Sequence, residues 1–167
     1  ENKEKLTQAE YIIKRKNEIT NPNVIFILDK DILVYKKDIP NINKVLYTEG
    51  YSIENDLYQG RAFEKKYFKQ DDKKDFEKSL DSFILYYACE LEKFYNGEKY
   101  IFSKMPDSII NKLDYSLNSS LLGEYIEPSQ KTVDYLKKGY DLLLRGHSLF
   151  NLVEMVMRKK GRKNKKN

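Results

Sequence analysis

The chain has 167 residues, of which 40% are hydrophobic and 34% charged. This composition excludes a disordered chain and fits one folded domain with a substantial core. No window approaches the ~18 uninterrupted apolar residues of a membrane span, and a single cysteine, Cys89, excludes an internal disulfide. We therefore expect a cytoplasmic protein with no membrane partner, in which Cys89 is a buried structural thiol.

The formal net charge of +5 arises at the carboxyl-terminal end of the sequence. Residues 158–167 hold seven basic side chains and no acidic one, whereas the other residues carry 24 basic and 26 acidic side chains. We predict that residues 158–167 form a disordered basic tail. Such a tail either adds salt-sensitive affinity for nucleic acid or acts only as a solubilising terminus.

The amino-terminal third of the sequence predicts an α/β arrangement. Residues 3–19 place apolar side chains at helical spacing, and Pro22 ends this predicted helix. Residues 24–28, Val-Ile-Phe-Ile-Leu, are typical of a strand buried on both faces of a parallel sheet. Residues 44–48 predict a second short strand. Together these elements indicate the later part of a βαβ arrangement.

Two acidic residues, Asp29 and Asp31, follow the first predicted strand directly. Open α/β sheets place their ligand sites at this end of their strands. Strand alternation would point both side chains the same way, about 7 Å apart, with Lys30 on the opposite side. Two carboxylates this close repel unless a cation lies between them, and oxygen ligands suit Mg²⁺ or Mn²⁺. The pair predicts a metal site, and a polar turn is the alternative.

A third acidic residue, Glu54, is predicted to approach the same place. The second strand is followed by a glycine turn and by Ser52, which is a predicted helix cap. Glu54 then falls in the first turn of a helix that begins near the carboxyl end of the second strand. It either shares a site with Asp29 and Asp31 or complements the positive end of the helix dipole.

The remainder of the sequence is predicted to be helical. Its 14 tyrosines and 8 phenylalanines recur at helical spacing, which favours a core over a base-stacking surface. We expect an α/β portion over residues 1–60, a helical portion over 61–157 packed on it, and the tail over 158–167. The predicted helices of the second portion cover residues 72–95, 106–117, 128–144 and 148–157, the last of them capped by Ser148.

Three segments carry a resemblance to a known family. They are Leu28-Asp29-Lys30-Asp31, Tyr51-Ser52-Ile53-Glu54-Asn55 and Arg145-Gly146-His147-Ser148-Leu149-Phe150. In order and approximate spacing they resemble a Toprim-like family of bacterial domains often encoded beside ABC- or AAA-type ATPases in anti-phage loci. The nuclease subunit of the PARIS-type defence system belongs to this group. The resemblance covers about residues 23–153.

The resemblance implies a partial Toprim-like parallel sheet followed by a mainly helical carboxyl-terminal half. It implies that Asp29 and Asp31 hold Mg²⁺ or Mn²⁺ and that Glu54 is a further ligand or a general base. The first Toprim strand carries a Glu-Gly pair upstream of the acidic pair. Glu49-Gly50 follows the acidic pair and cannot take this role, so we expect the first strand to be missing from this chain.

The third segment implies contact with phosphate. Arg145 would contact phosphate through its planar guanidinium, or would pair with a carboxylate such as Asp141. His147 stands where the family usually carries lysine, and it would match that charge only when protonated. The expected function is a metal-dependent nuclease of RNA or DNA that works with an ATPase partner in anti-phage defence. The alternative is a non-catalytic domain that docks on an ATPase.

Overall fold

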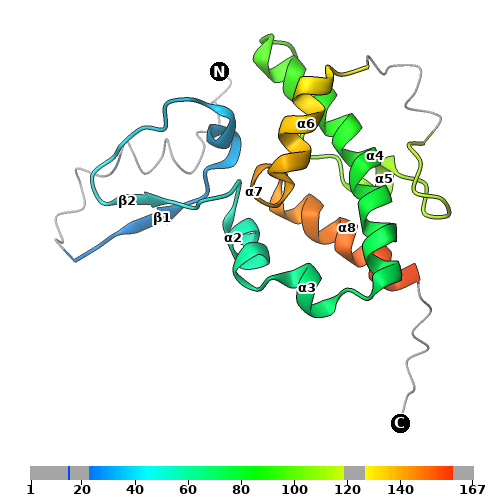
Figure 1. The fold of residues 1–167 in the computed structure, drawn as a ribbon. Coiled ribbons are helices and arrows are strands. Elements are labelled where there is room, and N and C mark those ends of the chain that lie inside the picture. Colours follow the sequence, from blue (N-terminus) through cyan, green and yellow to red (C-terminus); the bar gives the residue numbers. More distant parts are fainter. Residues whose placement is uncertain (1–14, 16–22, 119–126, 160–167) are drawn as a thin grey trace, which may run out of the picture.

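The computed structural model describes residue 15, residues 23–118 and residues 127–159. The helix predicted over residues 3–19 therefore lies outside the described residues, apart from Arg15, and so does almost all of the basic tail. The described residues form an α/β fold in which a small sheet lies beside a larger group of helices (Figure 1). None of the described helices combines the length and apolar character needed to span a membrane.

The sheet consists of two short parallel strands, β1 (Phe26–Leu28) and β2 (Val45–Tyr47), with Ile27 opposite Leu46. The parallel pairing that the sequence predicts is therefore confirmed. The connection between the strands contains a 3-10 helix, η2 (Asp31–Tyr35), followed by an irregular segment. Because the two strands are parallel, both end at the same edge of the sheet, beside the beginning of α2 (Ile53–Gly60).

The prediction that the first strand is buried on both faces is wrong for the described part of the chain. Leu28 packs with Ile42 and Val45 in a small core on one face. On the other face Ile25 and Ile27 expose 63% and 69% of their surface. The reason is that no described helix covers this second face, so the alternating side chains of the strand are divided between core and solvent.

The helical half comprises six helices after α2 within the described residues. They are α3 (Phe63–Tyr67), α4 (Gln70–Tyr95), α5 (Pro106–Ile109), α6 (Gln130–Lys138), α7 (Tyr140–Leu143) and α8 (Gly146–Lys159). The long helix predicted over residues 72–95 is confirmed as α4. It lies at the centre of the half and packs against α6 and α8 (Figure 1).

Three of the predicted helices differ from those observed. The helix predicted over 106–117 ends at Ile109, because the chain turns back at Tyr115, whose φ is 62°, and pairs residue 117 with residue 110. The helix predicted over 128–144 is divided into α6 and α7 at Gly139. The last helix begins at residue 146, so Ser148 lies inside it and is not its cap.

The core of the helical half is formed mainly by α4, α6 and α8. Tyr87 and Leu91 of α4 are completely buried, and Cys89 is buried as expected. The aromatic residues gather in this core, as predicted: the rings of Tyr87 and Phe102 stack 4.8 Å apart. The larger fully buried side chains of the three helices are Phe76, Phe83, Ile84, Tyr87, Leu91, Leu136, Leu149, Leu152 and Val156.

Candidate functional site

Asp29 lies directly after β1 and joins the sheet to the beginning of α2. Its Oδ1 accepts a hydrogen bond of 3.0 Å from the backbone N–H of Ile53, the first residue of α2. A carboxylate at this position complements the positive end of the helix dipole and satisfies one of the unpaired N–H groups of the first turn. Asp29 is therefore placed beside Glu54, the next residue of that turn.

Asp31 does not point in the direction that strand alternation predicts. Lys30 adopts a helical conformation and Asp31 has a φ of 51°, so the extended backbone has already ended before Asp31. The backbone N–H of Asp31 donates a hydrogen bond of 2.7 Å to the carbonyl of Tyr51. Burial raises the pKa of the Tyr51 hydroxyl, and its hydrogen bond with the Asp31 carboxylate raises this pKa further.

Glu54 lies in the first turn of α2, and Ser52 is the N-cap residue of this helix, as predicted. The Nδ1 atom of His147 lies 3.4 Å from the Oε1 atom of Glu54. Burial acts to raise the pKa of Glu54, but hydrogen bonds from Ser52 and from its own backbone N–H, with the nearby His147 and Arg145, lower it overall. The carboxylate form of Glu54 is therefore favoured.

Gly146 brings the third motif into direct contact with the second. A Cβ atom at position 146 would lie 2.4 Å from Oγ of Ser52 and 2.6 Å from Cβ of Glu54, which real structures do not tolerate. Only glycine lets the start of α8 approach the first turn of α2 this closely. Gly146 belongs to the third motif of the sequence, but nothing in that motif predicts this packing role.

Arg145 lies near Glu54, where its positive charge contributes to lowering the pKa of that carboxyl group. Its backbone N–H donates a hydrogen bond to the buried hydroxyl of Tyr87. Within the described part of the chain no ion pair joins Arg145 to Asp141, and the carboxylate of Asp141 accepts a hydrogen bond from Gln59. Arg145 and His147 are therefore the two basic residues near Glu54 at the first turn of α2.

Asn55 holds these segments together, a role that was not predicted from the sequence. It is completely buried. Its Oδ1 accepts a hydrogen bond of 3.0 Å from the backbone N–H of Ser52, and its Nδ2 donates bonds of 2.8 Å to the carbonyls of Asp141 and Leu144. The spacing Ser52-x-x-Asn55 resembles a capping box, which was the available signal.

The turn between β2 and α2 is fixed by Asp56. Its carboxylate accepts hydrogen bonds from the backbone N–H groups of Glu49 and Gly50, at 3.1 and 2.9 Å. The Nζ atom of Lys30 donates a bond of 2.6 Å to the carbonyl of Glu49. Glu49 and Gly50 therefore belong to a structural turn.

The carboxylates do not form a cluster of three ligands. Within residues 23–118 and 127–159, and at Arg15, no three His, Cys, Asp or Glu side chains are grouped so that they could hold a metal ion. Asp29, Asp31 and Glu54 each have a partner within the protein. A carboxylate accepts up to about four hydrogen bonds, however, and Mg²⁺ is commonly held by one or two carboxylates together with substrate phosphates. The donor chemistry therefore fits a site of that smaller kind.

Comparisons with protein-family models, curated proteins and solved structures give no match to this chain. The Toprim-like resemblance therefore rests on the three motifs alone.

Proposed function

We propose that this chain is the phosphodiester-cleaving part of a metal-dependent nuclease with a Toprim-like sheet. The main support is the contact between two motifs that lie about ninety residues apart in the sequence. Gly146 packs against Ser52 and Glu54, so the Arg-Gly-His segment stands at the helix turn that Asp29 caps. Two acidic and two basic side chains are thereby collected at the carboxyl-terminal edge of a parallel sheet, where α/β proteins bind ligands.

Each of these side chains has a role in the proposal, and so does Asp31, which follows Asp29 closely in the sequence. Arg145 and protonated His147 would hold a phosphate group of the nucleic acid. Asp29 and Asp31 would hold Mg²⁺ or Mn²⁺ together with a substrate phosphate, and Glu54 would accept a proton from the attacking water. When bound, the metal would polarise the phosphoryl oxygen. Anti-phage defence and an ATPase of the ABC or AAA type as partner follow from the family resemblance.

An assay of strand cleavage tests this proposal. Labelled single-stranded and double-stranded RNA and DNA are incubated with the protein and Mg²⁺ or Mn²⁺. Asp29→Asn keeps the hydrogen-bond acceptor for Ile53 but removes the charge, and Glu54→Gln does the same for its own partners. We expect cleavage by the unchanged protein and a loss of at least about a hundredfold in both variants. Asp38→Asn, which alters an exposed carboxylate in the connection between β1 and β2, is the matched control.

Two outcomes would contradict the nuclease proposal. One is the absence of cleavage by folded protein on all four substrates. The other is cleavage that Asp29→Asn leaves unchanged, because the activity would then not depend on the proposed site.

A non-catalytic docking domain is the second candidate, and one observation favours it. Ile27 and Leu46 face each other across the two strands and expose 69% and 56% of their surface, with Ile25 exposed beside them. Adjacent exposed apolar side chains mark interaction surfaces. If this face docks on an ATPase partner, Ile27→Asp will abolish co-elution with that ATPase after co-expression, while Asp29→Asn will leave it unchanged.

A further inference from the structure

The segment between α2 and α4 carries a local excess of positive charge. Residues 61–74 hold six basic side chains and three acidic ones, whereas the other residues before 158 hold 18 basic and 23 acidic side chains. All of residues 61–74 belong to the described part of the chain. The excess therefore lies on the short helix α3, on the turn before it and on the first turn of α4.

Two of the three acidic side chains of this segment are engaged within the protein. The carboxylate of Glu64 accepts hydrogen bonds from the hydroxyls of Tyr58 and Tyr140, the first of them at 2.7 Å. Asp72 is 7% exposed, and its carboxylate accepts a hydrogen bond of 2.8 Å from the backbone N–H of the N-cap residue of α4. Asp71 is therefore the only exposed acidic side chain of the segment.

The apolar side of α3 is anchored in the protein, so its basic side chains face solvent. The ring of Phe63 lies 6.0 Å from the ring of Phe150 of α8, and Phe68, just after α3, is buried. The Nζ atom of Lys66 lies 5.3 Å from the ring centre of Tyr67, which is itself exposed. The term basic patch is used below for the five exposed side chains of Arg61, Lys65, Lys66, Lys69 and Lys73.

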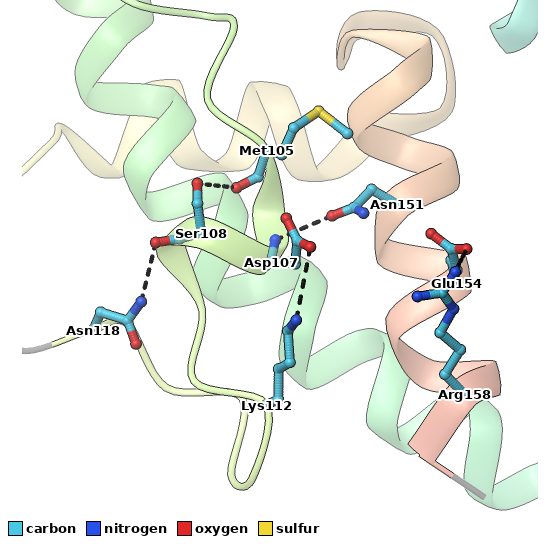
Figure 2. A network of polar contacts seen from close by, with 8 residues as sticks. All are labelled: Met105, Asp107, Ser108, Lys112, Asn118, Asn151, Glu154 and Arg158. Carbon is cyan, nitrogen blue, oxygen red and sulfur yellow. Dashed lines mark hydrogen bonds and ion pairs between the residues drawn. The ribbon is translucent and has the colours of Figure 1, made fainter. Parts of the chain in front are cut away.

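The charges of the basic patch are available to a partner. Within the described part of the chain, no ion pair joins any of the five side chains to a carboxylate. The surface around α5 and α8 differs in this respect, because Lys112 pairs with Asp107 at 3.7 Å and Arg158 pairs with Glu154 at 2.5 Å (Figure 2). A cluster of unpaired like charges attracts a polyanion, which the paired charges around α8 do not.

One side of α2 leads from the candidate site to the basic patch. Glu54, Leu57 and Arg61 follow one another at intervals of three and four residues, which places them on the same side of the helix. The seven residues from Glu54 to Arg61 span about 10 Å. Figure 1 shows α3 beside the carboxyl-terminal end of α2. At ~3.4 Å for each nucleotide, the patch begins about three nucleotides away from the candidate site.

We propose that the basic patch binds the phosphate backbone of the nucleic-acid substrate, about three nucleotides from the phosphate at Arg145 and His147. Contacts of lysine and arginine with phosphate carry no sequence information, so this binding is independent of sequence and weakens with salt. A lipid surface suits the patch less well. Helices that bind membranes present a broad apolar face, whereas α3 has five residues, of which only Tyr67 exposes a large apolar side chain.

The inference rests on the proposed nuclease function and adds to it a surface that holds the substrate outside the catalytic residues. Its test is binding without metal, so that cleavage plays no part. Fluorescence anisotropy is measured in EDTA at several salt concentrations, with labelled DNA and RNA of about twenty nucleotides, single-stranded and duplex.

Two double variants are compared with the unchanged protein. Lys65→Gln with Lys66→Gln removes two charges of the basic patch. Lys99→Gln with Lys131→Gln removes two exposed charges near the other end of α4 (Figure 1). For the nucleic acid that binds most tightly, we expect affinity about tenfold weaker in the patch variant. The slope of log affinity against log salt should become less steep by about 1–2 in that variant, and both quantities should stay unchanged in the control.

Equal affinities and equal salt slopes of the two variants would overturn the proposal, and so would the absence of binding to all four nucleic acids. Binding of vesicles of phosphatidylserine and phosphatidylcholine that is lost only in the patch variant, without binding of nucleic acid, would overturn it in favour of a lipid surface. If the patch variant does not fold, as judged by circular dichroism, Arg61→Gln with Lys73→Gln tests the same patch from the flanking elements.

The outcome is separable from the nuclease proposal. Binding in EDTA that depends on Lys65 and Lys66, without any cleavage in Mg²⁺, would refute only the nuclease. Cleavage in Mg²⁺ by a protein whose binding and cleavage do not depend on these two lysines would refute only the basic patch.

Discussion

The side-chain amide of Asn55 donates a hydrogen bond of 2.8 Å to the backbone carbonyl of Leu144, 89 residues later in the sequence. Asn55 stands beside Glu54 in α2, and Leu144 immediately precedes Arg145. This buried contact, together with the close packing of Gly146 against Ser52 and Glu54, therefore holds the acidic and the basic parts of the candidate site together. The two parts form one structural unit.

Replacing Asn55 with alanine should destabilise the protein by about 2–4 kcal/mol. The variant loses four hydrogen bonds that are buried or partly buried, two of them from Ser52, and leaves the carbonyls of Asp141 and Leu144 without this partner. Urea unfolding followed by circular dichroism measures the effect. Gln59→Ala is the matched control, because Gln59 also bonds to Asp141 but at an exposed position, and it should cost less than about 0.5 kcal/mol. Similar losses in the two variants would contradict the role of Asn55.

Gly146→Ala and Gly60→Ala should change stability in opposite directions. At position 146 the added methyl group would meet Ser52 and Glu54, and the required shift should cost about 1–3 kcal/mol. At Gly60, the last residue of α2, nothing lies within 4 Å of an added Cβ, so alanine should stabilise by up to about 1 kcal/mol. Thermal unfolding of both variants measures the two changes in stability. An unchanged stability of Gly146→Ala would show that the close approach of α8 to α2 is not required.

Glu54 should contribute to stability in a way that depends on pH. Its pKa is lowered in the folded protein from an ordinary value of 4.5, so the unfolded chain binds a proton more readily. The contribution is therefore complete above about pH 4.5 and is lost as the pH falls through the lower folded pKa. Unfolding free energies measured from pH 7 down to about pH 3 should show that the difference between the unchanged protein and Glu54→Gln becomes smaller at acidic pH. A difference that stays constant would contradict the lowered pKa.

The two faces of β1 should respond differently to truncation. Leu28 is 6% exposed and lies in the small core, so Leu28→Ala should cost about 2–4 kcal/mol. Ile27 is 69% exposed, so Ile27→Ala should cost less than about 0.5 kcal/mol. Urea unfolding of the two variants provides the comparison. A large cost at Ile27 would mean that another part of the chain covers this face.

The sequence was sufficient to predict the parallel strands, the long α4 helix and the place of Glu54 in a helix turn. These elements follow from local patterns: an apolar run, a helical apolar stripe and a cap at Ser52. The conformation of Asp31 could not be predicted from the sequence. Its positive φ breaks the alternation of side chains along the strand, on which the prediction depended. The exposure of one face of β1 also could not be predicted, since an apolar run does not reveal which of its faces is covered.

The contacts that assemble the candidate site were predicted least well. Asn55 and Gly146 are ordinary residues within their local patterns, and their roles depend on the packing of α8 against α2. In Gly146 the decisive property is the absence of a side chain, and in Asn55 it is an amide that reaches two distant carbonyls. Neither property is visible before the two segments are placed together.

A calorimetric titration of the protein with Mn²⁺ tests the proposed metal site most directly. The unchanged protein is compared with Asp29→Asn and Asp31→Asn, and with Asp38→Asn as a matched change of an exposed carboxylate. We expect binding in the micromolar to millimolar range that Asp29→Asn and Asp31→Asn abolish and Asp38→Asn preserves. Absence of binding to the folded protein, or binding that survives both substitutions, would contradict a metal-dependent site at this edge of the sheet.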